Sequence, residues 1–465
     1  MMLIRTLLIG ASAAALSACA VGPTYEARTE PPVALVSPPE HTTAAPAPAD
    51  WWSAFGDPEL SRLITRAQAS NTDLRIALAR VREARALFAD TRLDPLPRVS
   101  VGGAYNRSRG QQPGFTAGRV DLESAELGFD AAWEIDLFGR VRRQVEAARA
   151  EVGAAEADLQ DARVTLAAEV ARSYLQLRGA QARRAVAEEN ARTQRETLRL
   201  TQVRYEVGAA DPVDVESARA RLSATEAALP AFRTQEAQAS HRLAVLVGLR
   251  PGDPDPDLAA LSAPKAHTPP PQAVALGDAS SFLRRRPDVR AAERRLAAAT
   301  ARTGVATAEL FPAVRVSGFV GVLSGDLGSL FRSGAQAWSV SPAVSWPGLD
   351  LGGARARLRA AQARNDASLA QYDQTVLRAV EDLQNALVAY RERQLQVVSL
   401  SQQVAASRRA AELAGLRYRE GSLDFLRLLD AERTRLEAED ALAAAQTAAN
   451  IEVVAIYKAL GGAPV

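Results

Sequence analysis

The chain has 465 residues, with 56 Lys and Arg against 54 Asp and Glu, so its formal net charge is only +2. Positive and negative charges are nearly equal in number, and arginines alternate with acidic residues. This pattern is typical of solvated helix faces with intrahelical ion pairs and argues against nucleic-acid binding. The three histidines and one cysteine show no metal-ligand spacing, and no glycine motif opens a phosphate-binding helix, so we expect no catalytic site, no metal site and no cofactor.

Residues 1–18 predict a secretory signal. One positive charge at Arg5 precedes an apolar run too short for a membrane span, and small residues lead to Cys19. The sequence Leu16 to Cys19 resembles the bacterial lipoprotein box, which implies that Cys19 becomes the first mature residue and carries diacylglycerol and an N-acyl chain such as palmitate. The alternative is ordinary cleavage beside an incidental cysteine. Residues 19–57 are then a lipidated, Pro-rich N-terminal segment.

The remaining chain is a duplication. Residues 72–103 align with residues 287–318, and Asp73 matches Asp288 at an offset of 215 residues. Further along, "RYEVGAAD" at 204 matches "RYREGSLD" at 417. We therefore predict two copies of one structural unit, at 58–277 and 278–465, each far longer than a solenoid repeat.

Each copy begins with a predicted helix, at 58–92 and 279–309, that ends before a proline. Two segments with alternating apolar and polar residues follow, separated by a loop rich in turn residues, and they predict one β-hairpin per copy. The apolar positions are Val99, Val101, Tyr105, Leu127, Phe129, Ala131, Trp133 and Ile135 in the first copy, and Val314, Val316, Val320, Val322, Trp338, Val340, Val344 and Trp346 in the second. Because Pro342 removes a ladder donor, we expect a local bulge or an unpaired position there.

Long helices come next, at 139–206 and 353–419, each spanning about 100 Å. Shorter return helices at 212–247 and 425–460 span about 54 Å. We expect helix 279–309 to stack end to end on 212–247, and helix 58–92 to stack on 425–460, so that each pair matches one long helix. The stretch 248–271 is too rich in proline for regular structure.

Glycine and aspartate mark the ends of the helical hairpins. Gly208 and Gly421 lie where each long helix must reverse, a position that favours a left-handed residue. Asp211 and Asp424 follow as N-caps of the return helices, and Pro212 takes a first helical position.

Asp430 lies one helical turn after Leu426, so a leucine stripe ends in a carboxylate. One interpretation is a surface aspartate paired with Arg427 or Arg433 at helix spacing.

The four alternating strands have the pattern of membrane strands around a wet lumen. Open sheet edges cannot face lipid, so several chains must pool their hairpins, and twelve strands from three chains leave room for a conduit where eight would not. The alternatives are a soluble sheet with one buried face and a lipid-anchored coiled-coil scaffold without a pore.

The chain resembles the outer membrane factors, the TolC-like exit ducts of tripartite efflux systems, and especially their NodT-type lipoprotein branch. The resemblance rests on "LSACAVGPTY" at 16, "DWWSAFGDPEL" at 50, "WEIDLFGRVR" at 133, "RRPDVRAAERRLAAA" at 285, "FPAVRVSG" at 311, "LLDAER" at 428 and "YKALGG" at 457. It implies a mainly α fold with a β-barrel contribution, in which three chains form a twelve-stranded outer membrane barrel and a periplasmic helical barrel. The implied partners are a periplasmic adaptor and an inner membrane pump of the RND type, which supplies the energy.

The resemblance also assigns roles to residues at the hairpin ends. Leu426 and Asp430 would narrow the periplasmic aperture, Asp430 as one member of an acidic ring. The residues expected at the tips and at the adaptor contact are Gly208, Asp211, Tyr205, Gly421, Asp424 and Tyr418. The sequence does not indicate the cargo.

Overall fold

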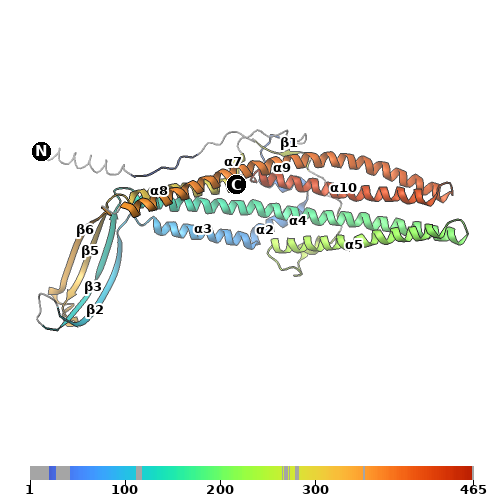
Figure 1. Cartoon of the computed structure of the whole chain (residues 1–465). Helices are drawn as coiled ribbons and strands as arrows, with labels where there is room; N and C mark the ends of the chain where they lie inside the picture. The colour runs from blue at the N-terminus through green and yellow to red at the C-terminus, as the bar shows by residue number, and fades with distance from the viewer. Residues whose placement is uncertain are drawn as a thin grey trace. The chain divides into compact units, whose positions relative to one another are not determined.

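The computed structural model describes residues 20–27, 42–111, 118–263, 265, 271, 273–277, 282–348 and 351–462. The chain forms two compact units (Figure 1). The first contains residues 1–28, 80–156 and 291–374, and the second contains the rest. Each unit therefore draws on both copies of the duplication.

The long helices form as predicted, with bounds within two residues of the expected ones. Each is connected to its return helix by a short turn (Figure 1). The helices are η1 (Trp51–Phe55), α2 (Pro58–Ser70), α3 (Thr72–Thr91), α4 (Arg140–Glu206), α5 (Pro212–Leu246), α6 (Pro256–Ala260), α7 (Phe282–Arg285), α8 (Pro287–Ala308), α9 (Leu351–Arg419) and α10 (Phe425–Ala459).

The first helix of each copy is broken, so the prediction of single helices at 58–92 and 279–309 was wrong. The breaks fall at Asn71 and Arg286, which are equivalent in the duplication. The Asn71 side chain accepts hydrogen bonds from the backbone N–H groups of Asp73, at 2.8 Å, and Leu74, at 3.2 Å, and so caps α3. At the second break, Pro287 disfavours helical geometry in the residue before it.

The expected pairing of stacked helices was also wrong, because stacking occurs within each copy. Ser70 Oγ donates to the carbonyl oxygen of Val247 at 2.7 Å, and Asn71 Nδ2 donates to that of Leu246 at 2.9 Å. The end of α5 therefore meets the start of α3. In the second copy, Arg286 Nη1 donates to the carbonyl oxygen of Ala459 at 3.0 Å, so the end of α10 meets the start of α8. The long linker after α5 leaves α8 free to stack elsewhere.

The two predicted hairpins join into one antiparallel sheet in the order β2-β3-β5-β6. Its strands are β2 (Arg98–Gly110), β3 (Val120–Ile135), β5 (Ala313–Ser324) and β6 (Gln336–Ser345). The register places Val101, Phe129, Val320 and Trp338 in one row across all four strands. Since directly paired residues share a face, the predicted apolar positions on these strands lie on one side of the sheet.

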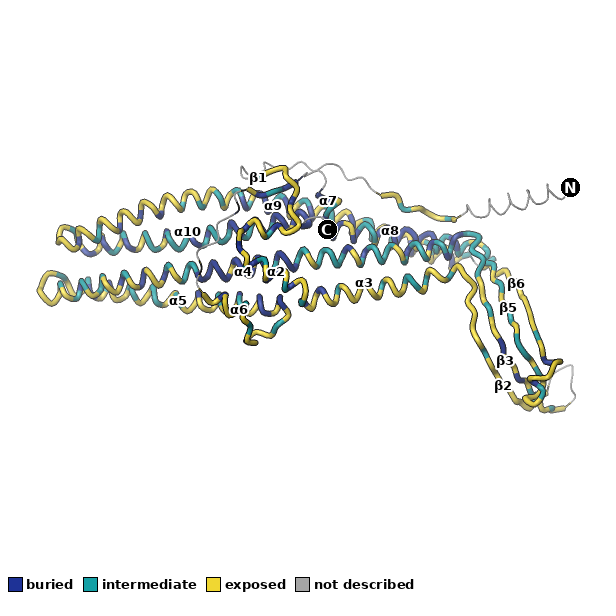
Figure 2. The backbone as a smooth tube through the Cα atoms, turned by 180° about the vertical axis from the view of Figure 1, so that it is seen from behind, coloured by how far each residue is buried: buried dark blue, intermediate teal, exposed yellow. Residues whose placement is uncertain are grey.

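Much of the sheet is exposed on both faces in the single chain (Figure 2). No strand among the described residues pairs with the outer edges of β2 and β6. Pro342 lies opposite Val316 in unbroken register, so the expected bulge or unpaired position is absent. Only alternate N–H groups of an edge strand face its partner, which lets proline occupy a position in β6.

The proline-rich linker is more ordered than predicted. Within 248–271 the structure has the short helix α6, which begins at the cap Asp255 and Pro256. Asp255 accepts from the backbone N–H of Leu258 at 3.1 Å and pairs with Arg66 of α2 at 2.6 Å. Close by in the sequence, β4 (Val274–Ala275) pairs in parallel with β1 (Thr42–Thr43). None of the helices among the described residues is long and apolar enough to cross a membrane.

Candidate functional site

The two helical hairpins reverse through the same backbone motif. Gly208 has φ +72° and Gly421 has φ +75°, the left-handed conformation that glycine adopts without strain. The N–H of Ala209 donates to the carbonyl oxygen of Arg204 at 2.7 Å, and that of Ser422 donates to Arg417 at 2.9 Å. These bonds satisfy carbonyl groups that the ends of α4 and α9 leave unpaired. The predicted reversals are confirmed.

The return helices begin at the predicted aspartates. Asp211 accepts from the backbone N–H of Val213 at 2.9 Å and forms a capping box with Asp214, and Pro212 opens α5. Asp424 accepts from the backbone N–H of Arg427 at 2.9 Å and caps α10. Local sequence therefore fixes both turns.

The two hairpins contact each other near their ends through Tyr418. Its ring packs with Ala218, Phe425 and Leu428 in a small buried cluster. Arg204 of α4 places its guanidinium 4.6 Å from the centre of the Tyr418 ring, and its Nη1 donates to the Tyr418 carbonyl oxygen at 2.5 Å. This contact connects the last turns of α4 and α9.

Tyr205 and Tyr418 are equivalent in the duplication but have opposite environments. The Tyr205 side chain is 48% exposed, whereas Tyr418 is 3% exposed. Tyr418 therefore cannot offer a docking surface in this arrangement, contrary to the expected adaptor contact. The exposed apolar residues of the first hairpin end are Tyr205, Val207 and Val213.

Leu426 and Asp430 lie one turn apart on the exposed side of α10. Leu426 is 64% exposed, although its neighbours Phe425 and Leu428 belong to the buried cluster. Asp430 forms an ion pair with Arg433 Nη2 at 2.7 Å, one of the two partners considered in the surface interpretation. The single chain thus brings Leu426 and Asp430 together and places the guanidinium group of Arg433 beside them.

Glu432, two residues further, is a buried carboxylic acid that the sequence analysis did not single out. It is 6% exposed, and its Oε1 accepts from Thr197 Oγ1 of α4 at 3.0 Å. Burial raises the pKa of Glu432 above its ordinary value, and the hydrogen bond from Thr197 opposes that shift only in part. The spacing Phe425, Leu428, Glu432 on the buried face of α10 was the available signal.

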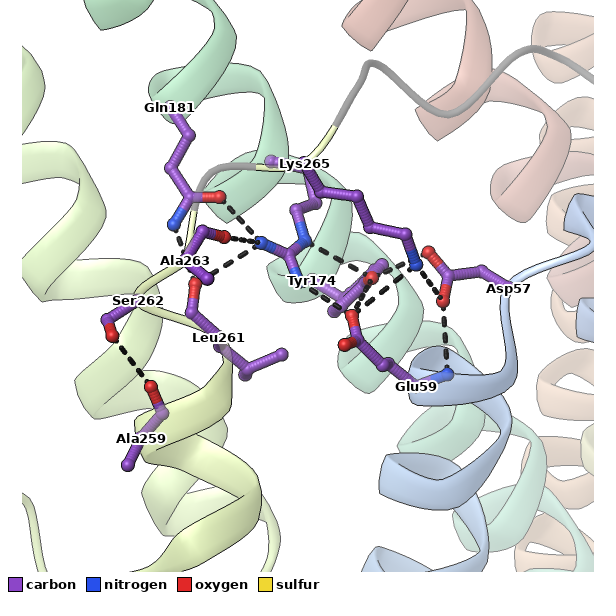
Figure 3. Close-up of polar contacts among 10 residues, drawn as sticks. Asp57, Glu59, Tyr174, Gln181, Ala259, Leu261, Ser262, Ala263 and Lys265 are labelled. Atoms are coloured by element: carbon purple, nitrogen blue, oxygen red, sulfur yellow. Dashed lines mark hydrogen bonds and ion pairs between the residues drawn. The ribbon is translucent and has the colours of Figure 1, made fainter.

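A second polar cluster connects α2, α4 and the linker (Figure 3). Tyr174 Oη donates to Asp57 at 2.6 Å, and Lys265 Nζ pairs with Asp57 at 2.9 Å. Arg178 donates to Glu59 at 2.7 Å and to the carbonyl oxygen of Ala263 at 2.9 Å. Lys265, one of only two lysines in the chain, thus closes a network between residues distant in sequence.

This network holds two carboxylates in their charged form. Burial raises the pKa of Asp57, but hydrogen bonds from Tyr174 and Lys265 outweigh it, so the pKa lies below its ordinary value. Burial also raises the pKa of Glu59, but the hydrogen bond from the Arg178 guanidinium lowers it, and the pKa again lies below its ordinary value. Asp57 is also the N-cap of α2, so one side chain stabilises a helix start and the linker contact.

Cys19 lies outside the described residues. Its neighbour Ala20 packs so closely on Gly139 that a Cβ at that glycine would lie 2.8 Å from the Ala20 Cα. The N–H of Val21 donates to the Phe138 carbonyl oxygen at 3.1 Å. Phe138 and Gly139 lie between the end of β3 and the start of α4, so Ala20 and Val21 are held near the end of β3.

The described residues contain no group of three or more side chains that could hold a metal ion. No catalytic arrangement is needed to account for the two clusters around α10 and Asp57.

Comparison with known proteins gives one consistent family. The family described as "Outer membrane efflux protein" matches residues 63–249 and 279–462. Outer membrane protein OprJ of Pseudomonas aeruginosa is 33% identical over 456 residues, covering 96% of this chain and 93% of OprJ. Nodulation protein T of Rhizobium leguminosarum bv. trifolii is 30% identical over 431 residues, covering 92% and 91% of the two chains. A solved structure of the outer-membrane channel OprN superposes with a TM-score of 0.92 at 46% identity, covering 96% of this chain and 99% of that one.

Proposed function

The chain belongs to the outer membrane efflux protein family, and we propose that it is held in the membrane by a lipid on Cys19 and closed at its periplasmic end around Leu426 and Asp430. It is the outer membrane channel of an efflux system in a Gram-negative cell envelope, with the TolC-like trimeric fold. A lipid-anchored scaffold without a pore is not favoured, because the related proteins are channels.

The main support for the channel function is the four-stranded sheet. Its two outer edges have no strand partner among the described residues, and its two faces differ in polarity. In lipid, each backbone N–H and C=O group of β2 and β6 needs a partner, and only neighbouring copies of the sheet can supply one. The apolar row of Val101, Phe129 and Val320 suits the lipid side. The opposite face, with Ser100 and Asp130, suits a water-filled lumen.

The lipid anchor is supported by the placement of Ala20. Ala20, which directly follows Cys19 in the sequence, packs on Gly139 in the loop that follows β3. A diacylglycerol and an N-acyl chain at that point reach the membrane next to the strand ends. Several acyl chains on one residue anchor a protein stably, which a single lipid chain does not achieve, and the membrane strands add to this attachment.

The partners follow from the role of an exit duct. We propose a homotrimer that works with a periplasmic adaptor and an inner membrane pump of the RND type, which provides the energy, so that this chain carries out no catalytic step. The exposed apolar side chains Tyr205, Val207 and Val213 give the end of the first hairpin a surface on which an adaptor could dock. Gly208 and Asp211 shape the turn that carries this surface, and Gly421 and Asp424 shape the equivalent turn of the second hairpin.

The aperture proposal concerns Asp430 and its neighbour Arg433. Three Asp430 carboxylates around one axis attract cations, and three Arg433 guanidinium groups beside them oppose this effect. At a pore, the two residues therefore have opposite effects on ion selectivity. In a surface ion pair away from the pore, loss of either partner has the same small effect.

The test is ion selectivity in planar bilayers. We expect Asp430→Ala to lower the preference for cations and Arg433→Gln to raise it, with trimer assembly unchanged in both. Glu437→Gln is the matched control, because Glu437 is another exposed carboxylate of α10 near Arg433. Equal selectivity in all three variants and the wild type would place Asp430 on the outer surface.

A further inference from the structure

The polar face of the sheet contains a row that is almost without side chains. Gly102 of β2 pairs with Gly128 of β3, which pairs with Gly321 of β5. Ala337 of β6 completes the row. The three neighbouring glycines present no side chain on this face, whereas the rows before and after them do.

Two side chains from the adjacent row cover these glycines. A Cβ at Gly128 would lie 2.5 Å from Phe319 Cε2, and one at Gly321 would lie 3.0 Å from Phe319 Cζ, so the Phe319 ring covers both glycines. A Cβ at Gly102 would lie 3.1 Å from Asp130 Oδ2, so the carboxylate covers the third. Phe319 and Asp130 are direct cross-strand partners.

This pair is unlike its surroundings. Phe319 is an aromatic residue on the face that otherwise carries Ser100, Ser317 and Ser339 nearby. Asp130 is exposed, and its carboxylate has no hydrogen bond or ion pair among the described residues. A ring face next to an unpaired carboxylate attracts an organic cation twice, through the π system and through charge.

We propose that Asp130 and Phe319 form a lumenal subsite for lipophilic organic cations, present three times in the trimeric barrel. The proposal rests on the channel function and on the polar face lining the lumen. A phosphonium or quaternary ammonium with aromatic groups fits the subsite, because it offers apolar surface to the ring and a weakly hydrated charge to the carboxylate. A small hydrated ion such as K⁺ gains only from the charge.

A purely structural role for Phe319 predicts different results for its variants. Aromatic rings protect glycines in strands, and that role needs apolar cover rather than a π face. Phe319→Leu keeps apolar cover and loses the ring, while Phe319→Tyr keeps the ring. Glu126→Gln is the matched charge control, because Glu126 lies on the same face of β3 but pairs with Ala104 and Leu323 instead of an aromatic residue.

The experiment measures block of K⁺ current by tetraphenylphosphonium through the purified trimer in planar bilayers. We expect the blocking constant to rise about fivefold in Phe319→Leu and in Asp130→Asn, a loss within the range of a cation–π contact. Phe319→Tyr and Glu126→Gln should match the wild type in block by tetraphenylphosphonium. Each blocking constant is taken relative to the unblocked K⁺ current of the same variant.

Two results would overturn the subsite. One is unchanged block in Phe319→Leu, which leaves Phe319 as glycine cover only. The other is equal weakening by Glu126→Gln and Asp130→Asn, which makes the effect one of lumen charge in general. A wild-type trimer that does not conduct at all would instead contradict the channel function.

Discussion

At the scale of single residues, two buried carboxylates of the second unit differ in their partners. Asp57 accepts hydrogen bonds from Tyr174 and Lys265, and its pKa is lowered. Glu432 has one hydrogen bond, from Thr197, and burial raises its pKa. A buried charge without sufficient partners reduces the free energy of unfolding, so Glu432 weakens the packing of α10 on α4 near the hairpin ends.

Glu432→Gln should therefore stabilise the protein at neutral pH, by about 1 kcal/mol, because it removes a buried charge and keeps the acceptor for Thr197. Because the pKa of Glu432 is raised in the folded state, the wild-type protein has its full stability below the pKa of the unfolded state. That stability is lost as pH rises through the folded-state pKa and the buried side chain becomes charged. The advantage of Gln should thus disappear below about pH 4. Thermal unfolding of the purified trimer between about pH 3 and pH 8 measures this loss.

Glu437→Gln provides the control for this titration, since Glu437 is an exposed carboxylate of the same helix. A pH-dependent gain of equal size in Glu437→Gln would show that the general charge of α10, rather than the buried Glu432, is responsible.

At the scale of elements, the four long helices end with the same glycine motif. Gly208, Gly248, Gly421 and Gly461 all have positive φ, between +72° and +82°. At the ends of α4 and α9 the motif forms an open turn. At the end of α5 it lies against the break between α2 and α3, and at the end of α10 it lies against the break between α7 and α8. A Cβ at Gly248 would lie 2.7 Å from the Ser70 carbonyl oxygen, and one at Gly461 would lie 2.9 Å from the Arg286 Cα.

Gly248→Ala should therefore destabilise the junction of α5 and α3 more than backbone strain alone can explain. Gly252 is the matched control, with φ +95° and nothing within 4 Å of its Cβ position. Left-handed strain costs about 1 kcal/mol in both variants, and displacement of Ser70 adds about 1 to 3 kcal/mol at Gly248 through lost hydrogen bonds. Thermal unfolding of both variants would detect the difference, and equal losses would contradict the close contact.

At the scale of the whole molecule, the assembly follows from what one chain leaves unsatisfied. The outer edges of β2 and β6 have no strand partner among the described residues, and the apolar face of the sheet is exposed. Twelve strands in a trimer satisfy the edges and place the apolar face in lipid and the polar face in the lumen.

Substitutions of adjacent residues on β6 test this assignment of faces. Val340→Arg puts a charge on the lipid side and should reduce trimer in the outer membrane strongly, since arginine near the bilayer midplane costs about 2 to 4 kcal/mol. Ser341→Arg puts the same charge on the opposite face and should be tolerated. Heat-modifiable migration of membrane fractions on denaturing gels reports the trimer, and equal losses in both variants would contradict the faces.

The duplication, the long helices, the glycine reversals, the aspartate caps and the two faces of the strands could all be predicted from the sequence. Each of these depends on neighbours within a few residues, where periodicity and turn chemistry dominate. The sequence could also bring Leu426 and Asp430 together, because one helical turn separates them.

Which helix ends meet and which of two equivalent residues is buried could not be predicted, because both depend on long-range packing. The hydrogen bond from Asn71 to Leu246 joins residues 175 positions apart, and no local pattern specifies that partner. Tyr205 and Tyr418 share the same local motif, yet only Tyr418 lies under Phe425 and Arg204. Burial depends on the surfaces that other segments contribute, so equivalent residues can have different environments in the two copies of the duplication.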